Sequence, residues 1–215
     1  MNCEIKTIIL GGSSGNCYLI KSSLGFVLID TGSKGKRKKL EIELEKAGCT
    51  PDNFHLVILT HGDFDHSGNC AYLKEKYNVE ISMHVNDEEM VKTGDQFYHW
   101  KDGRRLFRRI LTALFSIRRF TPDFTIDEGF SLSTYGINAR IIHLPGHSAG
   151  SIGILTDNGD FFCGDLFTNT DKPELNSILQ DEMDAKYSIK KLKNYLIDII
   201  YPGHGNPFPL NYLTP

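Results

Sequence analysis

The stretch from Thr60 to Asn69, T-H-G-D-F-D-H-S-G-N, gathers side chains that can bind metal ions. Four of them mix imidazole and carboxylate groups within a few positions: His61, Asp63, Asp65 and His66. These ligand types suit borderline and hard divalent cations. An ordinary solvated loop is the alternative, because short motifs also arise by chance. The other parts of the chain must decide between the two interpretations.

The residues that flank this motif predict how it is positioned. The apolar run Leu56–Leu59 precedes the motif and is typical of a buried strand. Residues 68–77 follow it and predict a helix. We therefore expect the four side chains in a loop between a strand and a helix.

Three later stretches each place one ligand-type side chain beside glycine, after an apolar run. They are L-P-G-H-S-A-G with His147, F-F-C-G-D with Asp165, and Y-P-G-H-G with His204. Glycine lets the backbone turn sharply next to a site. Alone, each of these side chains would more often be an incidental polar residue. Together with the first motif they favour one shared metal site, because strand ends at one sheet edge bring distant residues to a common point.

The remaining chain alternates between predicted strands and helices, which is typical of layered α/β folds. The expected strands comprise three within residues 3–30, and then 79–83, 138–143, 151–156, 160–164 and 199–201. A helix is expected over 36–47 and ends at Gly48. Helical segments are expected within 174–198, with Pro173 at a first helical position. No linker divides the sequence, so residues 1–215 are predicted to form a single domain.

Residues 86–129 interrupt this alternation and are expected to form a helical insertion. They include Tyr98, the only tryptophan, Trp100, and an arginine-rich stretch with apolar residues at helical spacing. An amphipathic helix packed on the domain is the favoured interpretation, and a membrane-surface helix is the alternative. We expect Tyr98 and Trp100 to contact the substrate. A lid, a dimer contact and a surface helix are all left open for this segment.

Composition narrows the class of protein. The chain has 215 residues and a formal net charge of −3, which argues against nucleic acid as a partner. Its five cysteines are dispersed without a C-x-x-C motif, so we expect free thiols. No apolar run approaches the ~18 residues of a membrane span, and the N-terminus lacks a signal-peptide pattern. We expect a cytoplasmic protein without a transmembrane segment, and a homodimer is left open.

Taken together, the four motifs resemble the metallo-β-lactamase-fold hydrolase superfamily. The family pattern is H-x-H-x-D-H, followed at a distance by His, Asp and His, and L-I-D-T-G at 28–32 is a further match. The resemblance covers nearly the whole chain outside 86–129. It implies an αββα four-layer sandwich with a dinuclear metal site at one edge of the sheets.

The resemblance also implies a role for each motif residue. One metal position would use His61, Asp63 and His147, and the other would use Asp65, His66 and His204. Asp165 would bridge two divalent ions, which would be zinc, iron or manganese. A metal-bound hydroxide would attack the substrate, with Asp65 and His66 acting through it. Asp30 would orient a ligand histidine by accepting its other N–H, and a simple turn cap is the alternative for this residue.

The chain departs from the family pattern at Asp63, where the second histidine is usual. Two divalent ions carry four positive charges, which three carboxylates and a hydroxide would cancel. With the usual histidine in place of Asp63, the centre would keep one positive charge. Oxygen ligands suit harder ions. We therefore expect a shift from zinc toward iron or manganese. Poor occupancy of the first position is the alternative.

Several activities are compatible with this pattern, because fold does not determine substrate. The favoured function is hydrolysis of a small-molecule ester, thioester or lactone, as in the glyoxalase II and lactonase branches that the sequence resembles. A diiron oxidoreductase with a separate electron donor is an alternative, since Asp63 resembles a ligand of flavodiiron proteins. A phosphodiesterase or nuclease is a third alternative, and a non-catalytic binding module is a fourth.

Overall fold

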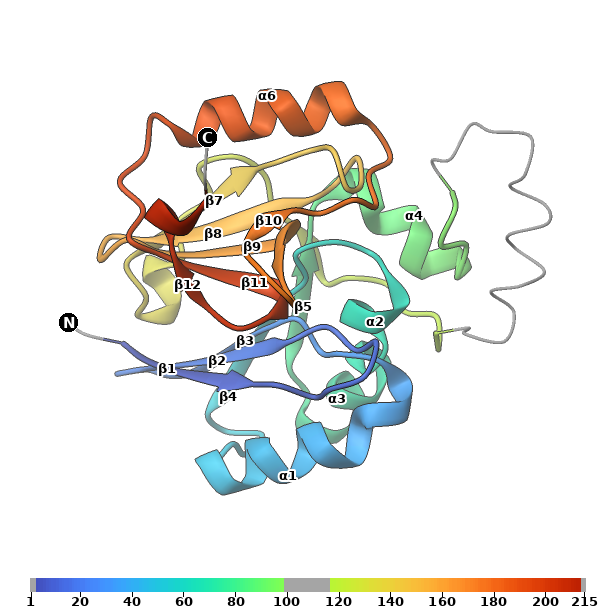
Figure 1. Ribbon diagram of the computed structural model, residues 1–215. Helices are drawn as coiled ribbons and strands as arrows, with labels where there is room; N and C mark the ends of the chain where they lie inside the picture. Colours follow the sequence, from blue (N-terminus) through green and yellow to red (C-terminus); the bar gives the residue numbers. More distant parts are fainter. Residues whose placement is uncertain (1–2, 99–116, 214–215) are drawn as a thin grey trace.

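Two β-sheets lie face to face and carry helices on their outer faces (Figure 1). This arrangement comes from a computed structural model, which describes residues 3–98 and 117–213. Helices α1 (Arg37–Ala47) and α3 (Cys70–Tyr77) lie outside the N-terminal sheet, and α6 (Glu182–Leu192) lies outside the C-terminal sheet. The four-layer αββα sandwich expected from the sequence is confirmed.

The N-terminal sheet has the strand order β1-β2-β3-β4-β5-β6. Its strands are β1 (Glu4–Ile8), β2 (Cys17–Ser22), β3 (Gly25–Ile29), β4 (Phe54–Ile58), β5 (Glu80–Met83) and β6 (Phe124–Thr125). The first three pair antiparallel, and β3 to β6 pair in parallel. Parallel pairing brings the C-terminal ends of β3 and β4 to one edge. Asp30 and the 60–66 motif follow these two ends.

The C-terminal sheet has the strand order β12-β11-β9-β8-β7, with β10 paired to β9. Its strands are β7 (Ala139–His143), β8 (Ile152–Thr156), β9 (Asp160–Asn169), β10 (Glu174–Leu175), β11 (Ile199–Gly205) and β12 (Phe208–Pro209). Strands β9 and β11 run parallel. Both extend further than the sequence predicts. Asp165 and His204 therefore lie inside strands rather than after them.

Alternating side chains divide the apolar core into layers. Ile29 of β3 packs between the sheets in a cluster with Phe162 of β9. The adjacent Leu28 points to the opposite face and packs with Leu44 of α1. Likewise, Phe161 belongs to the cluster beneath α6. Both faces of these strands are covered, which explains why their sequences are apolar almost throughout.

The helix predicted over 68–77 is present as α3, and a further short helix precedes it within the 60–66 motif. Helix α2 (Phe64–Ser67) already contains Asp65 and His66, so only His61 and Asp63 lie in a loop. The carbonyl oxygen of Asp63 accepts the N–H groups of His66 at 3.0 Å and Ser67 at 2.8 Å, which closes the first turn. Two ligand-type side chains are thereby fixed on a helix, where rotation of the backbone is restricted.

Two further helix ends test the sequence patterns. The predicted end of α1 at Gly48 is confirmed, with a left-handed φ of 86°. The prediction of a helix start at Pro173 is wrong, because the next residues form β10 on the edge of β9. Helix α6 begins instead after Asp181, whose carboxylate accepts the N–H groups of Met183 and Asp184. A side-chain cap supplies these acceptors, and proline cannot.

The predicted insertion at 86–129 is only partly covered by the structure. Helix α4 (Val85–Thr93) lies at its start, whereas Trp100 and most of the arginine-rich stretch lie outside the described residues. Among the residues that are described, no helix is long and apolar enough to cross a bilayer.

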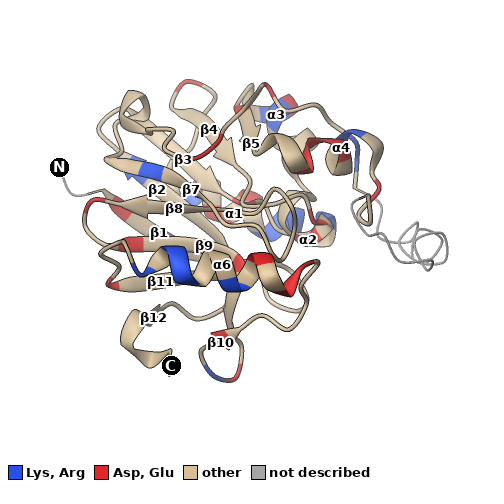
Figure 2. Ribbon diagram, turned by 90° about the horizontal axis from the view of Figure 1, so that it is seen from above, with Lys and Arg blue, Asp and Glu red and all other residues tan. Residues whose placement is uncertain are grey.

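Figure 2 shows acidic residues at the beginning of α6 and lysines toward its end, so the helix does not carry a face of one sign.

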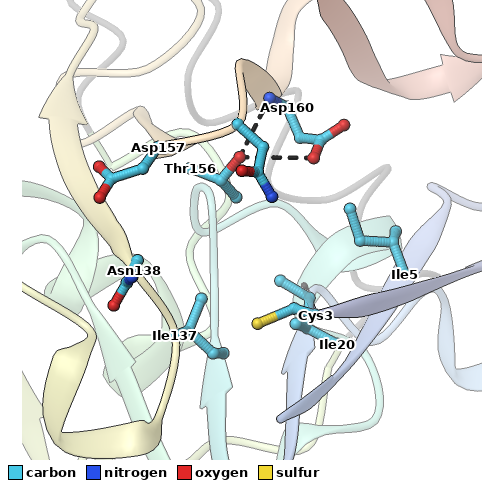
Figure 3. A pocket seen from close by; sticks show the side chains of 9 residues that line it. Cys3, Ile5, Ile20, Ile137, Asn138, Thr156, Asp157 and Asp160 are labelled. Atoms are coloured by element: carbon cyan, nitrogen blue, oxygen red, sulfur yellow. Dashed lines mark hydrogen bonds between the residues drawn. The ribbon is translucent and has the colours of Figure 1, made fainter. Parts of the chain in front are cut away.

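The five cysteines are free, as expected. Four of them are buried, and Cys3 is half-buried at the rim of a small cavity of about 50 Å³ (Figure 3). This cavity lies by the turn before β9, lined by residues such as Ile20, Ile137 and Asp160. It is too small to accommodate more than a water-sized group. It therefore offers no room for a substrate.

Candidate metal centre

Seven side chains from both sheets converge at one edge of the sandwich. His61 and Asp63 follow β4, and Asp65 and His66 lie on α2. His147 follows β7, Asp165 lies in β9 and His204 lies in β11. Their ligand atoms form overlapping groups within 4.8 Å of one another. The seven residues singled out from the sequence are thus brought together.

The first group contains His61, Asp63 and His147. Asp63 Oδ2 lies 3.2 Å from His147 Nε2 and 3.8 Å from His61 Nε2. The carboxylate that replaces the usual histidine therefore points into the centre. Its position fits a ligand role and argues against a solvated loop.

The second group contains Asp65, His66 and His204. Asp65 Oδ2 lies 3.2 Å from His204 Nε2 and 3.9 Å from His66 Nε2. The two Nε2 atoms are themselves 3.4 Å apart. This group thus repeats the composition of the first one, with two imidazoles and one carboxylate.

Asp165 lies between the two groups. Its Oδ1 is 3.2 Å from Nε2 of His66, and its Oδ2 is 3.4 Å from Nε2 of His204. The same Oδ2 is 4.0 Å from Nε2 of His147, in the first group. Both oxygens therefore lie near the second group and Oδ2 also faces the first, and a carboxylate placed between two groups in this way is suited to bridging them.

Hydrogen bonds orient three of the four histidine rings with Nε2 toward the centre. His66 donates from Nδ1 to Asp30 Oδ2 at 2.8 Å, and His147 donates from Nδ1 to the carbonyl oxygen of Ile178 at 2.7 Å. The Nδ1 atom of His61 lies 3.0 Å from Thr60 Oγ1. Protonation of Nδ1 leaves the Nε2 lone pair free for a cation.

Asp30 is the anchor of this arrangement. Its carboxylate accepts hydrogen bonds from His66, from the N–H of Thr60 at 2.8 Å and from Thr60 Oγ1 at 2.7 Å. Asp30 has a φ of 58°, in the left-handed region that non-glycine residues rarely adopt. This backbone conformation turns the carboxylate from the end of β3 toward the motif. The predicted contact of Asp30 with a histidine of the motif, His66, is present.

Two groups that orient these histidine rings were not predicted from the sequence. Thr60 precedes the first histidine and could have been suspected from that position. The carbonyl oxygen of Ile178 could not, because every residue carries a backbone carbonyl and no side-chain type marks this one.

Glycine allows the backbone to approach two of the ligands closely. A Cβ atom at Gly203 would overlap Oδ1 of Asp165, and one at Gly15 would lie 2.5 Å from the ring of His66. Only hydrogen fits at both positions. The P-G-H pattern around His204 thus reflects steric need as well as turn formation.

Carboxylates in the centre shift the pKa values of the histidines that they face. Burial disfavours charge on His147, but the hydrogen bond with Asp63 raises its pKa to about 9. Burial also disfavours charge on His204, yet the hydrogen bond with Asp165 raises its pKa to about 9. For His61, burial dominates and lowers the pKa well below its ordinary value. Protonation is therefore favoured at His147 and His204 and disfavoured at His61.

The donor set fits divalent cations. Nε2 of His61 is buried and has no hydrogen-bond partner among the described residues, although it faces the centre. A buried polar atom without a partner is costly, and coordination of a cation would satisfy it. Imidazole and carboxylate ligands suit zinc, iron and manganese alike.

A further cluster of His84, Asp127 and His143 is less suited to a metal ion. The two imidazole rings stack 4.0 Å apart with an interplanar angle of 9°. A cation cannot lie in the plane of both rings when the planes are parallel and separated. In addition, Nδ1 of His84 accepts the N–H of Asn86, which places its proton on Nε2, the atom nearest Asp127.

The fold and the clustered ligand types define a metal-dependent hydrolase. The chain belongs to the metallo-β-lactamase superfamily, whose family pattern matches residues 10–204. A probable metallo-hydrolase of Methanocaldococcus jannaschii is 29% identical over 203 residues, covering 90% of this chain and 89% of that protein. Hydroxyacylglutathione hydrolase GloC of Haemophilus influenzae is 31% identical over 157 residues, covering 72% of this chain and 66% of that protein.

A solved structure shares the same architecture. The crystal structure of TTHA1623 in a di-iron-bound form is 25% identical with a TM-score of 0.76, and the match covers 96% of each chain. The chain spans between 62% and 66% of the length of three of the curated relatives that it matches. Membership of the superfamily establishes a metallo-hydrolase whose fold binds metal ions.

The two predicted substrate contacts, Tyr98 and Trp100, are not tested by the structure. Tyr98 is exposed and follows α4, where its N–H donates to the carbonyl oxygen of Asp95 at 3.1 Å. Trp100 lies outside the described residues. Both remain sequence-based predictions.

Proposed function

We propose that the chain hydrolyses a small-molecule ester, thioester or lactone at a dinuclear metal centre. The observation that supports it is the convergence of Nε2 atoms whose rings are oriented through Nδ1. The proposed ligands are His61, Asp63 and His147 at one position, Asp65, His66 and His204 at the other, and Asp165 between them. The similarity to hydroxyacylglutathione hydrolase GloC supports a thioester in particular.

The accessible side of the centre indicates where a substrate enters. The side chains of Asp63, Asp65 and His204 are 31%, 14% and 22% exposed, whereas His61 and His66 are at most 1% exposed. The substrate therefore approaches past the two carboxylates and His204. The buried histidines, held from behind by Thr60 and Asp30, form the fixed base of the site.

Bound divalent ions would polarise the substrate carbonyl oxygen and lower the pKa of the attacking water molecule. In the proposed reaction, the chain contributes positioning and proton handling. Asp65 lies on the accessible side, where its carboxylate orients the attacking water and accepts its proton. His66 keeps its Nε2 directed inward because Nδ1 is tied to Asp30. In this proposal residues 1–215 form one domain.

The identity of the two ions follows from charge. Asp63 gives the first group a carboxylate in place of a neutral imidazole, and oxygen ligands suit iron and manganese. The di-iron-bound form of TTHA1623 supports iron as one candidate. We propose that iron or manganese occupies the centre in preference to zinc.

Metal analysis combined with a substrate panel tests the proposal. Protein expressed with balanced zinc, iron and manganese should contain close to two ions per chain and hydrolyse thioesters or lactones. Asp165→Asn should lose metal and activity together. Asp160→Asn is the matched control, because this carboxylate lies in the same strand and accepts instead from the hydroxyl groups of Thr156 and Tyr201.

The result that would overturn the proposal is a metal-loaded protein inactive on every ester, thioester and lactone. Stoichiometric zinc with negligible iron and manganese would reject the metal preference alone. Hydrolysis of phosphodiesters only would move the proposal to a nuclease or phosphodiesterase.

A diiron oxidoreductase is the second candidate. Asp63 and the di-iron-bound form of TTHA1623 favour it. A separate electron donor would be needed to reduce the centre. An iron-loaded chain that cycles with a chemical reductant and consumes oxygen would support this function. A colourless dizinc esterase would exclude it.

A further inference from the structure

A buried carboxylate outside the proposed ligand set joins two loops of the centre. Asp87 lies in the first turn of α4 and is 0% exposed. Its Oδ2 accepts the N–H of Gly62 at 3.0 Å and the hydroxyl of Ser148 at 2.6 Å. Its Oδ1 accepts the N–H of Gly150 at 2.7 Å. One carboxylate thus satisfies three donors from two separate loops.

Both loops carry ligands of the first group. Gly62 lies between His61 and Asp63, and Ser148 directly follows His147. The first loop leaves the N-terminal sheet after β4, and the second leaves the C-terminal sheet after β7. Asp87 therefore connects the sheets at the point where they present these three ligands.

The second group has no such connection to Asp87. Within residues 3–98 and 117–213, no hydrogen bond joins the Asp87 side chain to Asp65, His66 or His204. Those ligands depend on other contacts, among them the bond between His66 and Asp30. Asp30 serves both groups, His66 directly and His61 through Thr60, whereas the direct hydrogen bonds of Asp87 reach the loops of the first group alone among the described residues.

Close packing fixes the position of Asp87. A Cβ atom at Gly150 would lie 2.6 Å from Cγ of Asp87, and one at Gly62 would lie 3.1 Å from Met90 of α4. Glycine at both positions lets the loops approach the helix. The positive end of the α4 dipole also favours a carboxylate in this first turn.

We propose that Asp87 is a positioning residue for the first group. Its carboxylate holds the loops of His61, Asp63 and His147 at the spacing that a cation requires, and it makes no direct hydrogen bond to the second group. This inference rests on the two-position centre of the proposed function. Asp87 would support the centre without touching a cation, and it lies outside the sequence motifs.

Manganese titration of the metal-stripped full-length chain tests this inference by calorimetry. Asp87→Asn keeps the shape of the side chain but loses its charge and one acceptor. We expect the affinity of one of two manganese ions to fall by about ten- to a hundred-fold, as for other groups that orient ligands. Ser148→Ala removes a single donor and should cause a smaller loss in the same step. Asp123→Asn is the matched control, because this carboxylate also accepts a backbone N–H, from Ile81, away from the centre.

Two variants, each lacking one histidine of one group, identify which metal position Asp87→Asn affects. In His204→Ala, which keeps the first group intact, adding Asp87→Asn should abolish the remaining tight manganese binding. In His61→Ala, which keeps the second group intact, adding Asp87→Asn should leave manganese affinity unchanged. Thermal unfolding of the metal-stripped variants shows whether each one folds, and Ser148→Ala carries the test if Asp87→Asn does not.

Equal losses at both positions, or none at either, would overturn the positioning role while leaving the centre in place. Failure of the unmodified chain to bind two manganese ions would instead overturn the two-position centre and this inference with it.

Discussion

His66 and Asp30 share a 2.8 Å hydrogen bond that joins the second metal group to the end of β3. Asp30 also accepts a hydrogen bond from the hydroxyl of Thr60, and this hydroxyl oxygen lies 3.0 Å from Nδ1 of His61. One carboxylate therefore orients an imidazole in each group. Asp30 has a left-handed backbone conformation, which is unfavourable for a residue other than glycine. This conformation occurs at the position from which the carboxylate makes these contacts.

Replacing Asp30 with Asn should weaken metal binding without changing the fold. Asparagine tolerates the left-handed conformation, so the backbone keeps its path. The neutral amide supports His66 less well as a ligand, and we expect metal affinity to fall by about ten- to a hundred-fold. Competition with a zinc chelator measures the change. Unchanged affinity would show that the Asp30–His66 bond is not needed to hold the ligand.

Asp63→His should shift the metal preference toward zinc. The substitution restores the usual family histidine and removes one negative charge from the first group. Elemental analysis of protein expressed with balanced metals should show a higher ratio of zinc to iron plus manganese. Asp63→Asn is the control, since it removes the same charge without adding an imidazole. An identical metal content in all three proteins would contradict the charge argument.

The stability of the metal-stripped chain should decrease as the pH rises from about 6.5 to 9. His147 and His204 have pKa values raised from 6.5 to about 9 in the folded chain. The folded state therefore binds more protons than the unfolded state in this window, and stability is lost as these protons leave. His61 works in the opposite direction near pH 6.5, because its lowered pKa keeps it neutral in the folded chain while the unfolded chain still binds a proton, and it contributes little at higher pH. Urea unfolding at several pH values, with chelator present, measures the trend.

Metal affinity should show the opposite trend over the same window. A cation must displace the protons held by His147 and His204, so binding strengthens as the pH rises. Proton release during titration, measured in buffers of different ionisation enthalpy, checks this. Binding without proton release near neutral pH would contradict the raised pKa values.

Gly203→Ala should disrupt the centre although it adds one methyl group. The new Cβ would overlap Oδ1 of Asp165, and this strand interior cannot move freely. Overpacking of this kind typically costs about 1–3 kcal/mol of stability. We also expect loss of the bridging geometry, seen as metal content below two per chain. Gly35→Ala is the control, because a Cβ there meets nothing within 4 Å.

The sequence predicts well which side chains gather at the sheet edge, because ligand-type residues are recognised by their side-chain chemistry. His147, Asp165 and His204 could be recognised from their chemistry and from adjacent glycines. Strands such as Gly25–Ile29, whose apolar residues fill both faces, indicated a layered α/β fold, and the family resemblance implied the four-layer arrangement. Local sequence patterns were sufficient where the type of a residue alone indicates its role.

Supporting contacts were harder to predict because they depend on tertiary position. Asp87 is a single acidic residue in a short helix, and its sequence neighbourhood does not reveal its three donors. The carbonyl oxygen of Ile178 leaves no mark in the sequence at all. The helix expected at Pro173 failed for a similar reason, because pairing with β9 overrode a local preference.

The separation of the ligands along the chain has a consequence for synthesis on the ribosome. The first group needs His147, which is 84 residues beyond Asp63, whereas the second needs His204, which is 138 residues beyond His66. At roughly 5–20 residues per second, the two groups become complete seconds apart. A nascent chain therefore carries all three donors of the first group several seconds before His204 completes the second.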